Sequence, residues 1–288
     1  MTKLGKTAVM ALSAIAASAL ASTAVSAATL QEIQDSGSIR IAVANEIPYG
    51  YIDPVSGEAM GAGPDVAKHI AEELGVTDIE WITTDFSSLI PGLQADRFDM
   101  VAAEMAIIPT RCATVIYSEP NTSYGEGLLV PAGNPERLTG YADFAENSDL
   151  KVAIMAGANQ LDMMQALGVS EDQLVTISSN ADAISTVSTG RANAYAATGL
   201  TASELAGQSD AVEVAEGFSD PVIDGTEQRS WGGFVFAQGN EELRDAVNEV
   251  LAEYKQSDEW LETVSGYGFT DADTSRSFDM STEELCAE

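Results

Sequence analysis

The fold of this chain is decided by the stretch that begins Ser38-Ile39-Arg40-Ile41-Ala42-Val43-Ala44. Its alternating, branched apolar residues predict a β-strand. Apolar residues at helical spacing over 65–74 predict a helix after it. The pattern continues with a strand at 79–82, a helix at 86–95 and a strand at 98–103. This β-α-β-α-β order is typical of a mostly parallel sheet with helices on its faces.

A second run of the same kind follows a break at residues 131–134. We predict strands at 151–154, 174–177, 194–197 and 212–215, and helices at 161–167 and 180–189, with Asn180 as an N-cap. A strand at 231–236 and helices at 241–255 and 258–264 close the chain. We therefore expect an α/β protein with two Rossmann-like lobes joined by a two-stranded hinge. Lobe 1 would comprise residues 29–127 and 228–288, and lobe 2 residues 128–227.

The first 28 residues resemble a secretory signal peptide. Lys3 and Lys6 precede an apolar stretch over 7–20, and small residues predict cleavage near Ala27 or Ala28. A membrane anchor is the alternative, but the apolar stretch is too short and too rich in alanine to span a bilayer. We expect a protein exported through the inner membrane to the periplasm.

The chain has two cysteines, Cys112 and Cys286. In an exported protein they are most simply interpreted as one disulfide, and two buried free thiols are the alternative. A disulfide would tie the C-terminus to the neighbourhood of Arg111. No Cys-x-x-Cys pair is present, so neither a redox motif nor a zinc site is indicated.

The chain is strongly acidic, with 45 Asp and Glu against 13 Lys and Arg and a formal net charge of −32. Such a surface repels nucleic acid and anionic lipid. Molar salt shortens the Debye length to about 3 Å and removes most of the self-repulsion. We therefore expect a protein of a halophilic cell; a generic acidic protein is the alternative.

Signals for catalysis are weak. The single histidine, His69, lies on a predicted helix beside Lys68, where a surface or packing role is expected. No nucleophile elbow, Walker loop or dinucleotide fingerprint occurs. We expect no cofactor and no metal.

Residues suited to binding follow the predicted strands at their carboxyl ends, where α/β sheets hold ligands. Glu46 would neutralise a cation that Tyr49 meets with its ring face, and Phe86 offers a second ring or simply packs in the core. Arg111 suits a carboxylate, with a structural ion pair as its alternative. Asn159 lies at a helix start that could bind an anion. The complementary ligand is a small zwitterion with a delocalised cation and a carboxylate.

Further motifs carry a family resemblance. They are Gly63-Pro64-Asp65-Val66-Ala67, Leu89-Ile90-Pro91-Gly92-Leu93, Phe98-Asp99-Met100-Val101-Ala102-Ala103, Tyr117-Ser118-Glu119-Pro120 and Gly190-Arg191-Ala192-Asn193-Ala194. With Pro109-Thr110-Arg111-Cys112 they resemble the periplasmic solute-binding proteins of ABC importers for polar amino acids. The resemblance implies the type II periplasmic binding protein fold, over nearly all of the mature chain.

Within that family the chain is most similar to the ectoine/hydroxyectoine-binding component. The shared features are Asn45-Glu46 with Tyr49, Arg111-Cys112, the Leu-Cys-Ala ending and Ser230-Trp231-Gly232-Gly233-Phe234. The resemblance implies that Glu46 faces the ring nitrogens of the ligand, that Tyr49 and Phe86 embrace the cation, and that Arg111 takes the carboxylate.

The chain also departs from the family. Thr198 stands where amino-acid binders carry an aspartate for the α-ammonium of the ligand, which favours a ligand without that group. Ala106, Glu104 and Ile108 replace an aromatic residue, a glycine and a threonine of the subgroup. We therefore expect either an incomplete aromatic cage or one whose missing wall is supplied by Met105, Tyr51 or Trp231.

The predicted function is the non-enzymatic receptor of an ABC importer. It would act as a monomer that closes on ectoine or hydroxyectoine, compatible solutes used in osmoprotection, and delivers them to an inner-membrane permease. The predicted ligand-binding residues are Glu46, Tyr49, Phe86, Glu104, Met105, Arg111, Asn159, Thr198 and Trp231. The alternatives are a receptor for a polar or cationic amino acid, a receptor that feeds a chemosensor, and an enzyme such as a cyclohexadienyl dehydratase with Glu46 or Glu104 as acid or base.

Overall fold

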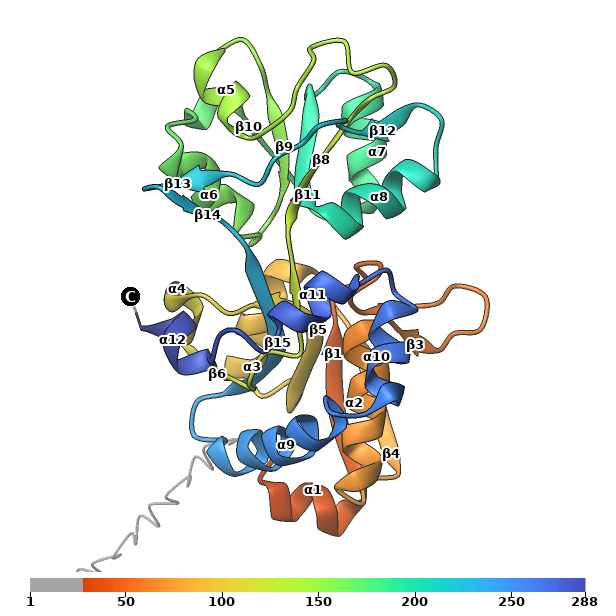
Figure 1. Cartoon of the computed structure of the whole chain (residues 1–288). Helices are drawn as coiled ribbons and strands as arrows, with labels where there is room; N and C mark the ends of the chain where they lie inside the picture. The colour runs from red at the N-terminus through yellow and green to blue at the C-terminus, as the bar shows by residue number, and fades with distance from the viewer. Residues whose placement is uncertain (1–27, 288) are drawn as a thin grey trace, which may run out of the picture.

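The computed structural model describes residues 28–287, so the predicted signal peptide lies outside the described residues apart from Ala28. Figure 1 shows two lobes, one above the other, joined by two extended segments. Each lobe has its own central sheet, and we use lobe 1 and lobe 2 for the parts built around those sheets. No helix in residues 28–287 is both long and apolar enough to cross a membrane.

The sheet of lobe 1 has the strand order β4-β1-β5-β15-β6, with β7 also paired to β15. Strands β4, β1 and β5 are parallel, as the sequence predicts, and β15 runs antiparallel to β5. The strands are β1 (Ser38–Val43), β4 (Asp78–Thr83), β5 (Met100–Ala106), β6 (Val115–Tyr117), β7 (Thr122–Tyr124) and β15 (Ser230–Ala237).

Helices cover both faces of this sheet. In α2, Val66 and Ile70 are buried in a core cluster with Ile41 of β1, because they share one helix face. The helices of lobe 1 are α1 (Leu30–Ser36), α2 (Ala62–Glu73), η1 (Phe86–Ser88), α3 (Leu89–Gln94), α4 (Pro109–Cys112), α9 (Glu241–Tyr254), α10 (Asp258–Ser265), α11 (Asp271–Arg276) and α12 (Thr282–Cys286). A small hairpin, β2 (Tyr51–Ile52) and β3 (Ala59–Met60), precedes α2.

The sheet of lobe 2 has the order β10-β9-β11-β8-β12. Its strands are β8 (Glu126–Pro131), β9 (Val152–Met155), β10 (Leu174–Ile177), β11 (Ala194–Thr198) and β12 (Val212–Val214). Its helices are α5 (Ala142–Glu146), α6 (Gln160–Ala166), η2 (Glu171–Gln173), α7 (Ala181–Ser188) and α8 (Gly199–Gly207), and a hairpin is formed by β13 (Val222–Ile223) and β14 (Thr226–Glu227).

Two segments connect the lobes. The first runs from β7 through Gly125 into β8, and the second from β14 into β15 (Figure 1). The chain therefore leaves lobe 1 once and returns once, which is the arrangement of a two-stranded hinge. The residue limits that we predict for the lobes remain our proposal.

Some local predictions need correction. The helix expected at 86–95 begins with the 3₁₀ turn η1 and continues as α3. Asn180 precedes α7 as predicted, but its side chain makes no capping hydrogen bond; its Oδ1 accepts from the Tyr195 hydroxyl. Strand β8 and helix α8 were not predicted.

The C-terminus returns to lobe 1. Cys112 of α4 and Cys286 of α12 form a disulfide with a Cα–Cα distance of 5.8 Å, so the predicted pairing is present in the structure. Thr282, at the start of α12, donates from Oγ1 to Ser118 O at 2.6 Å. The tail is thus held at lobe 1 by a covalent and a polar contact.

Candidate ligand-binding site

A tight turn after β1 forms the first part of the site. Tyr49 N donates to Glu46 O at 2.8 Å, and Glu46 N donates to Gly50 O at 3.0 Å. This turn directs both Glu46 and Tyr49 into the space between the lobes, where they are 7% and 2% exposed. Burial raises the pKa of the Glu46 carboxyl, and a hydrogen bond from Thr201 opposes that rise.

Glu104 forms the second part, on strand β5. Its φ of 46° lies in the left-handed region, which is unusual for a residue with a side chain inside a strand. The register of β5 against β15 shifts nearby, between Gly233 and Val235. A Cβ at Gly232 would lie 2.9 Å from the backbone oxygen of Glu104 and 2.7 Å from its Oε2, so a glycine is needed beside this glutamate. Backbone strain of this kind is commonly found at binding sites.

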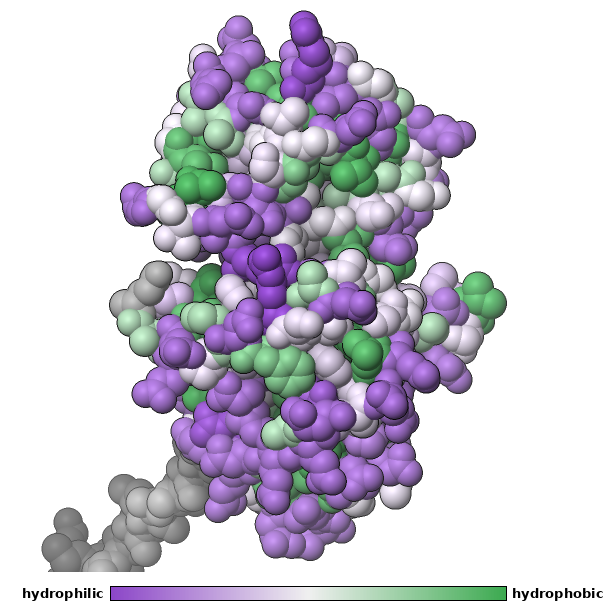
Figure 2. All heavy atoms as spheres, in the orientation of Figure 1, coloured by the Kyte–Doolittle hydropathy of each residue, from purple (hydrophilic) through white to green (hydrophobic). Residues whose placement is uncertain are grey.

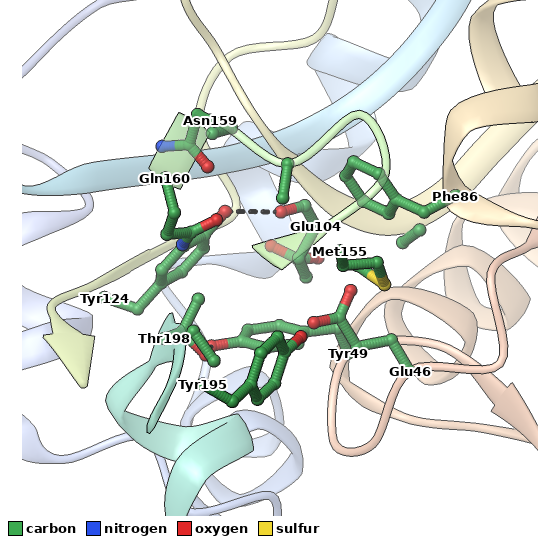
Figure 3. Close-up of a pocket in the computed structure, with 14 residues that line it drawn as sticks. Glu46, Tyr49, Phe86, Glu104, Tyr124, Met155, Asn159, Gln160, Tyr195 and Thr198 are labelled. Carbon is green, nitrogen blue, oxygen red and sulfur yellow. Dashed lines mark hydrogen bonds between the residues drawn. The ribbon is translucent and has the colours of Figure 1, made fainter. Parts of the chain in front are cut away.

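Polar neighbours hold the Glu104 carboxyl in place. Asn121 Nδ2 donates to Oε1 at 2.7 Å, and Thr122 Oγ1 donates to Oε2 at 2.5 Å. Burial raises the pKa of this carboxyl, and the two hydrogen bonds oppose the rise. The Tyr124 hydroxyl donates to the backbone oxygen of Glu104 at 2.7 Å, as Figure 3 shows. The carboxyl is therefore fixed before any ligand arrives.

Lobe 2 supplies the facing wall. Tyr195 and Thr198 come from β11, Met155 ends β9, and Gln160 begins α6. In the close-up these side chains surround the same space as Glu46, Tyr49, Phe86 and Glu104 (Figure 3). The residues that line this cavity are Glu46, Tyr49, Phe86, Ala103, Glu104, Ala106, Tyr124, Met155, Ala158, Asn159, Gln160, Tyr195, Ala197 and Thr198. None of them is basic.

The lobes are closed on this cavity. The Tyr49 hydroxyl donates to Thr198 Oγ1 at 2.7 Å, and Thr201 Oγ1 donates to Glu46 Oε1 at 3.2 Å. Both contacts join the turn after β1 to the start of α8. An acidic residue and an aromatic residue of lobe 1, Glu46 and Tyr49, thus contact lobe 2 directly.

Arg111 lies at the edge of the cavity and is not among its lining residues. It donates from Nη1 to Ala106 O and from Nη2 to Gly157 O, each at 2.9 Å. Its guanidinium carbon lies 5.5 Å from the ring centroid of Phe86. Arg111 therefore joins the lobes in this structure, and its contact with a ligand carboxylate remains a prediction.

Six of the nine predicted binding residues line the cavity: Glu46, Tyr49, Phe86, Glu104, Asn159 and Thr198. Met105 is buried in the hydrophobic core with Phe86 and Leu89. Trp231 donates from its indole to Arg276 O at 2.9 Å. Tyr51 lines a separate crevice with Ile47 and Leu205.

Tyr124 and Tyr195 line the cavity, whereas Met105, Tyr51 and Trp231, which the sequence suggested for its missing wall, do not. Tyr124 lies directly before Gly125, in the first of the two segments that connect the lobes. We predict no strand there, and the sequence has no signal that would identify Tyr124 as a binding residue. Tyr195 lies in the predicted strand 194–197 and could have been found as its only large side chain. Gln160 directly follows Asn159 at the predicted helix start, and Met155 directly follows the predicted strand 151–154, so these two positions were the available signals.

Within residues 28–287, no cluster of His, Cys, Asp and Glu has the arrangement of a metal site. His69 stacks on Tyr254 with ring centroids 3.6 Å apart, in a packing role on α2. The cavity therefore combines two buried carboxyl groups with aromatic rings and polar side chains, which suits a small cationic or zwitterionic solute.

The comparisons with known proteins agree with this architecture. The chain belongs to the bacterial extracellular solute-binding proteins, family 3, whose model matches residues 39–270. A protein of Sinorhizobium fredii named as a probable amino-acid ABC transporter periplasmic-binding protein, y4tE, is 54% identical over 263 residues, 91% of this chain and 87% of that protein.

Two solved structures are similar throughout. EhuB in complex with hydroxyectoine has a TM-score of 0.81 and 32% identity, and the match covers 90% of this chain and 97% of EhuB. The ancestral amino acid-binding protein AncCDT-1, a precursor of cyclohexadienyl dehydratase, has a TM-score of 0.71 and 28% identity, over 83% of this chain and 98% of that one. The chain has the type II periplasmic binding protein fold and is the substrate-binding component of an amino-acid-type ABC importer.

Proposed function

We propose that this protein binds ectoine or hydroxyectoine in the cavity between its lobes and delivers it, as a monomer, to an inner-membrane permease. The observation that carries the proposal is the lining of the cavity. Two buried carboxyl groups, Glu46 and Glu104, adjoin the rings of Tyr49, Phe86, Tyr124 and Tyr195, and no basic side chain lines the space. Such a lining stabilises a delocalised cation.

Thr198 supports a ligand without a free α-ammonium group. Its hydroxyl accepts hydrogen bonds from the Tyr49 hydroxyl and from Thr201 N, at 2.7 and 3.1 Å. It therefore offers no negative charge to an ammonium group. Similarity to EhuB, whose structure holds hydroxyectoine, points to the same ligand class.

Arg111 is the proposed partner of the ligand carboxylate. Its guanidinium donates to Ala106 O and Gly157 O. Ala106 lines the cavity, and Gly157 is the neighbour of Ala158, which also lines it. A carboxylate that enters beside Phe86 would offer the guanidinium a charged acceptor in place of a neutral carbonyl. Charge-assisted hydrogen bonds of this kind are about twice as strong as neutral ones.

A polar or cationic amino acid is the second candidate ligand. The relative from Sinorhizobium fredii is named for amino acids, and the carboxyl groups of Glu46 and Glu104 could hold an ammonium or guanidinium group. We further propose that the protein is not an enzyme. The similarity to AncCDT-1, a precursor of a dehydratase, makes turnover of prephenate or arogenate the direct test of that point.

Calorimetric titration of the mature protein tests the proposal. The panel is ectoine, hydroxyectoine, glycine betaine, glutamine, arginine and glutamate, at low and high salt. Tight binding of ectoine or hydroxyectoine alone supports the proposed ligand. Binding of an α-amino acid keeps the transport role and removes the ectoine assignment, and turnover of prephenate removes the non-enzymatic role.

A further inference from the structure

Two buried residues that do not line the cavity continue the hydrogen bonds of Glu104. Asn121 is fully buried and donates from Nδ2 to Glu104 Oε1 at 2.7 Å. Its Oδ1 accepts from the indole Nε1 of Trp260 at 2.9 Å. Trp260 is also buried and lies in the first turn of α10. The side chains of Trp260, Asn121 and Glu104 thus form one hydrogen-bonded chain that runs from α10 to the cavity.

Trp260 sets the direction of these hydrogen bonds. An indole N–H can only donate, so the atom of Asn121 that faces Trp260 is the carbonyl oxygen. The amide nitrogen of Asn121 therefore faces Glu104 and donates to it. Thr122 Oγ1 donates to the other carboxyl oxygen of Glu104 at 2.5 Å. Glu104 accepts from the protein at both oxygens, and a carboxylate keeps further lone pairs with which it can accept from a ligand.

Lys255 holds the segment that carries Asn121. It follows α9, and its Nζ donates to the backbone oxygen of Pro120, the residue directly before Asn121, at 2.6 Å. The same Nζ lies 5.5 Å from the ring centroid of Trp260. Burial raises the pKa of the Glu104 carboxyl, and its hydrogen bonds and the charge of Lys255 oppose that rise. The segment is therefore held both from the end of α9 and from α10.

We propose that Trp260 and Asn121 are positioning residues that present Glu104 to the cavity as a hydrogen-bond acceptor, so that this wall selects a ligand group that donates hydrogen bonds. The inference rests on the proposed binding in the cavity between the lobes. A cationic N–H group would form a charge-assisted hydrogen bond with the carboxylate. A carboxylate of the ligand would meet a second acceptor there and is excluded from this wall.

An exchange of donor and acceptor between positions 104 and 121 tests the direction of the bond. In Asn121→Asp two buried acceptors face each other, so the folding equilibrium constant should fall about 10- to 100-fold. In the double variant Asn121→Asp with Glu104→Gln, the new amide nitrogen at position 104 donates to the new carboxylate at position 121, which still accepts from Trp260. The double variant should regain a folding equilibrium constant within about threefold of the wild type.

Urea denaturation measures these constants and needs no ligand. Asn147→Asp is the matched control, because it adds the same charge at an exposed position and keeps an acceptor for Asp149 N. It should unfold like the wild type. A double variant no more stable than Asn121→Asp, or an Asn121→Asp variant as stable as the wild type, would overturn the inference.

Calorimetric titration with hydroxyectoine tests the selection. The double variant should bind about 10- to 100-fold more weakly than the wild type, as expected for Glu104→Gln alone, even though its folding is restored. The reason is that the negative charge then lies at position 121, behind the wall, and an amide faces the ligand. Wild-type affinity in the double variant would show that the charge of Glu104 does not select the ligand.

Trp260→Phe removes the indole N–H and keeps a ring beside Lys255. Its affinity for hydroxyectoine should fall about 3- to 10-fold with Glu104 present and less than about twofold in the Glu104→Gln background, because Trp260 acts through Glu104. Trp81→Phe, on β4, is the matched control and should bind like the wild type. Equal losses in the two backgrounds would leave Trp260 a packing role only. If no solute of the panel binds but the exchange restores folding, the proposed ligand fails and the orientation of Glu104 stands.

Discussion

At the scale of single residues, two buried carboxyl groups define the chemistry of the cavity. Glu46 comes from a turn after β1 and Glu104 from a strained position in β5. Asn121 and Thr122 hold Glu104, while Thr201 reaches Glu46 from the other lobe. Glu104 therefore belongs to a rigid wall, whereas the environment of Glu46 is complete only when the lobes close.

Replacing Glu104 by Gln should weaken ligand binding about 10- to 100-fold, because a charge-assisted contact of about 1.5–3 kcal/mol is lost while the shape is kept. Calorimetric titration with hydroxyectoine measures the effect. Glu73→Gln, at an exposed position on α2, is the matched control and should bind like the wild type. Unchanged affinity in Glu104→Gln would remove this carboxyl from the cation site.

Arg111→Ala should abolish binding while the protein stays folded, because both the proposed carboxylate clamp and the contact with Gly157 O are lost. Arg111→Lys keeps the charge but not the two-pronged geometry, so it should recover only part of the affinity. Titration gives the affinities, and circular dichroism checks the fold. Retained affinity in Arg111→Ala would remove the clamp argument.

At the scale of elements, the hinge and the C-terminal tail link parts that are far apart in sequence. Strands β8 and β15 both begin at the crossings, and Glu126 and Ser230, their first residues, are in contact there. The tail returns through α12 to α4, where the disulfide bridges a sequence separation of 174 residues. The polar contacts of α12 with Ser118 and Glu119 add to this attachment.

Removing the disulfide in a Cys112→Ser and Cys286→Ser double variant should lower the free energy of unfolding by up to about 5 kcal/mol, since closure of so long a loop restricts the unfolded chain. Thermal unfolding with and without reductant measures the loss. The reductant should lower the melting temperature of the wild type toward that of the double variant and leave the variant unchanged. Equal melting temperatures of the two proteins without reductant would contradict the expectation.

At the scale of the whole molecule, the dominant property is negative charge. The chain carries a formal net charge of −32, and Figure 2 shows hydrophilic residues over most of the visible face of lobe 1, mixed with neutral and hydrophobic residues on lobe 2. Self-repulsion of this size opposes the compact state and is screened by salt. The surface therefore supports our proposal that the protein works in a salt-rich environment.

The melting temperature should rise as KCl increases from 0.1 to 2 M, by about 2–4 °C for each kcal/mol of repulsion that is removed. Differential scanning calorimetry measures the rise. Choline chloride at the same concentrations is the control, because a screening effect should occur with either cation. A flat or falling melting temperature in both salts would contradict a salt-adapted surface.

The sequence by itself determined the class of fold and much of the site. Local patterns such as residues 38–44 and 174–177 predict the strands because hydrophobic periodicity is set by burial on one sheet. The carboxyl-end rule then placed Glu46, Phe86 and Glu104 beside one cavity, since parallel strands end at a common edge. The cysteine pair predicted the return of the tail.

Only the tertiary structure decided how those residues are used. Tyr124 and Tyr195 reach the cavity from different lobes, Arg111 donates to Gly157 O across the interface, and the Tyr141 hydroxyl faces Glu126 Oε2 together with two backbone oxygens. Glu126 and Tyr141 are 15 positions apart in the sequence and Arg111 and Gly157 are 46 apart, and no local pattern specifies the directions of these side chains. Periodicity reports which face of an element is buried; the partner that each buried polar group meets depends on how the two lobes close.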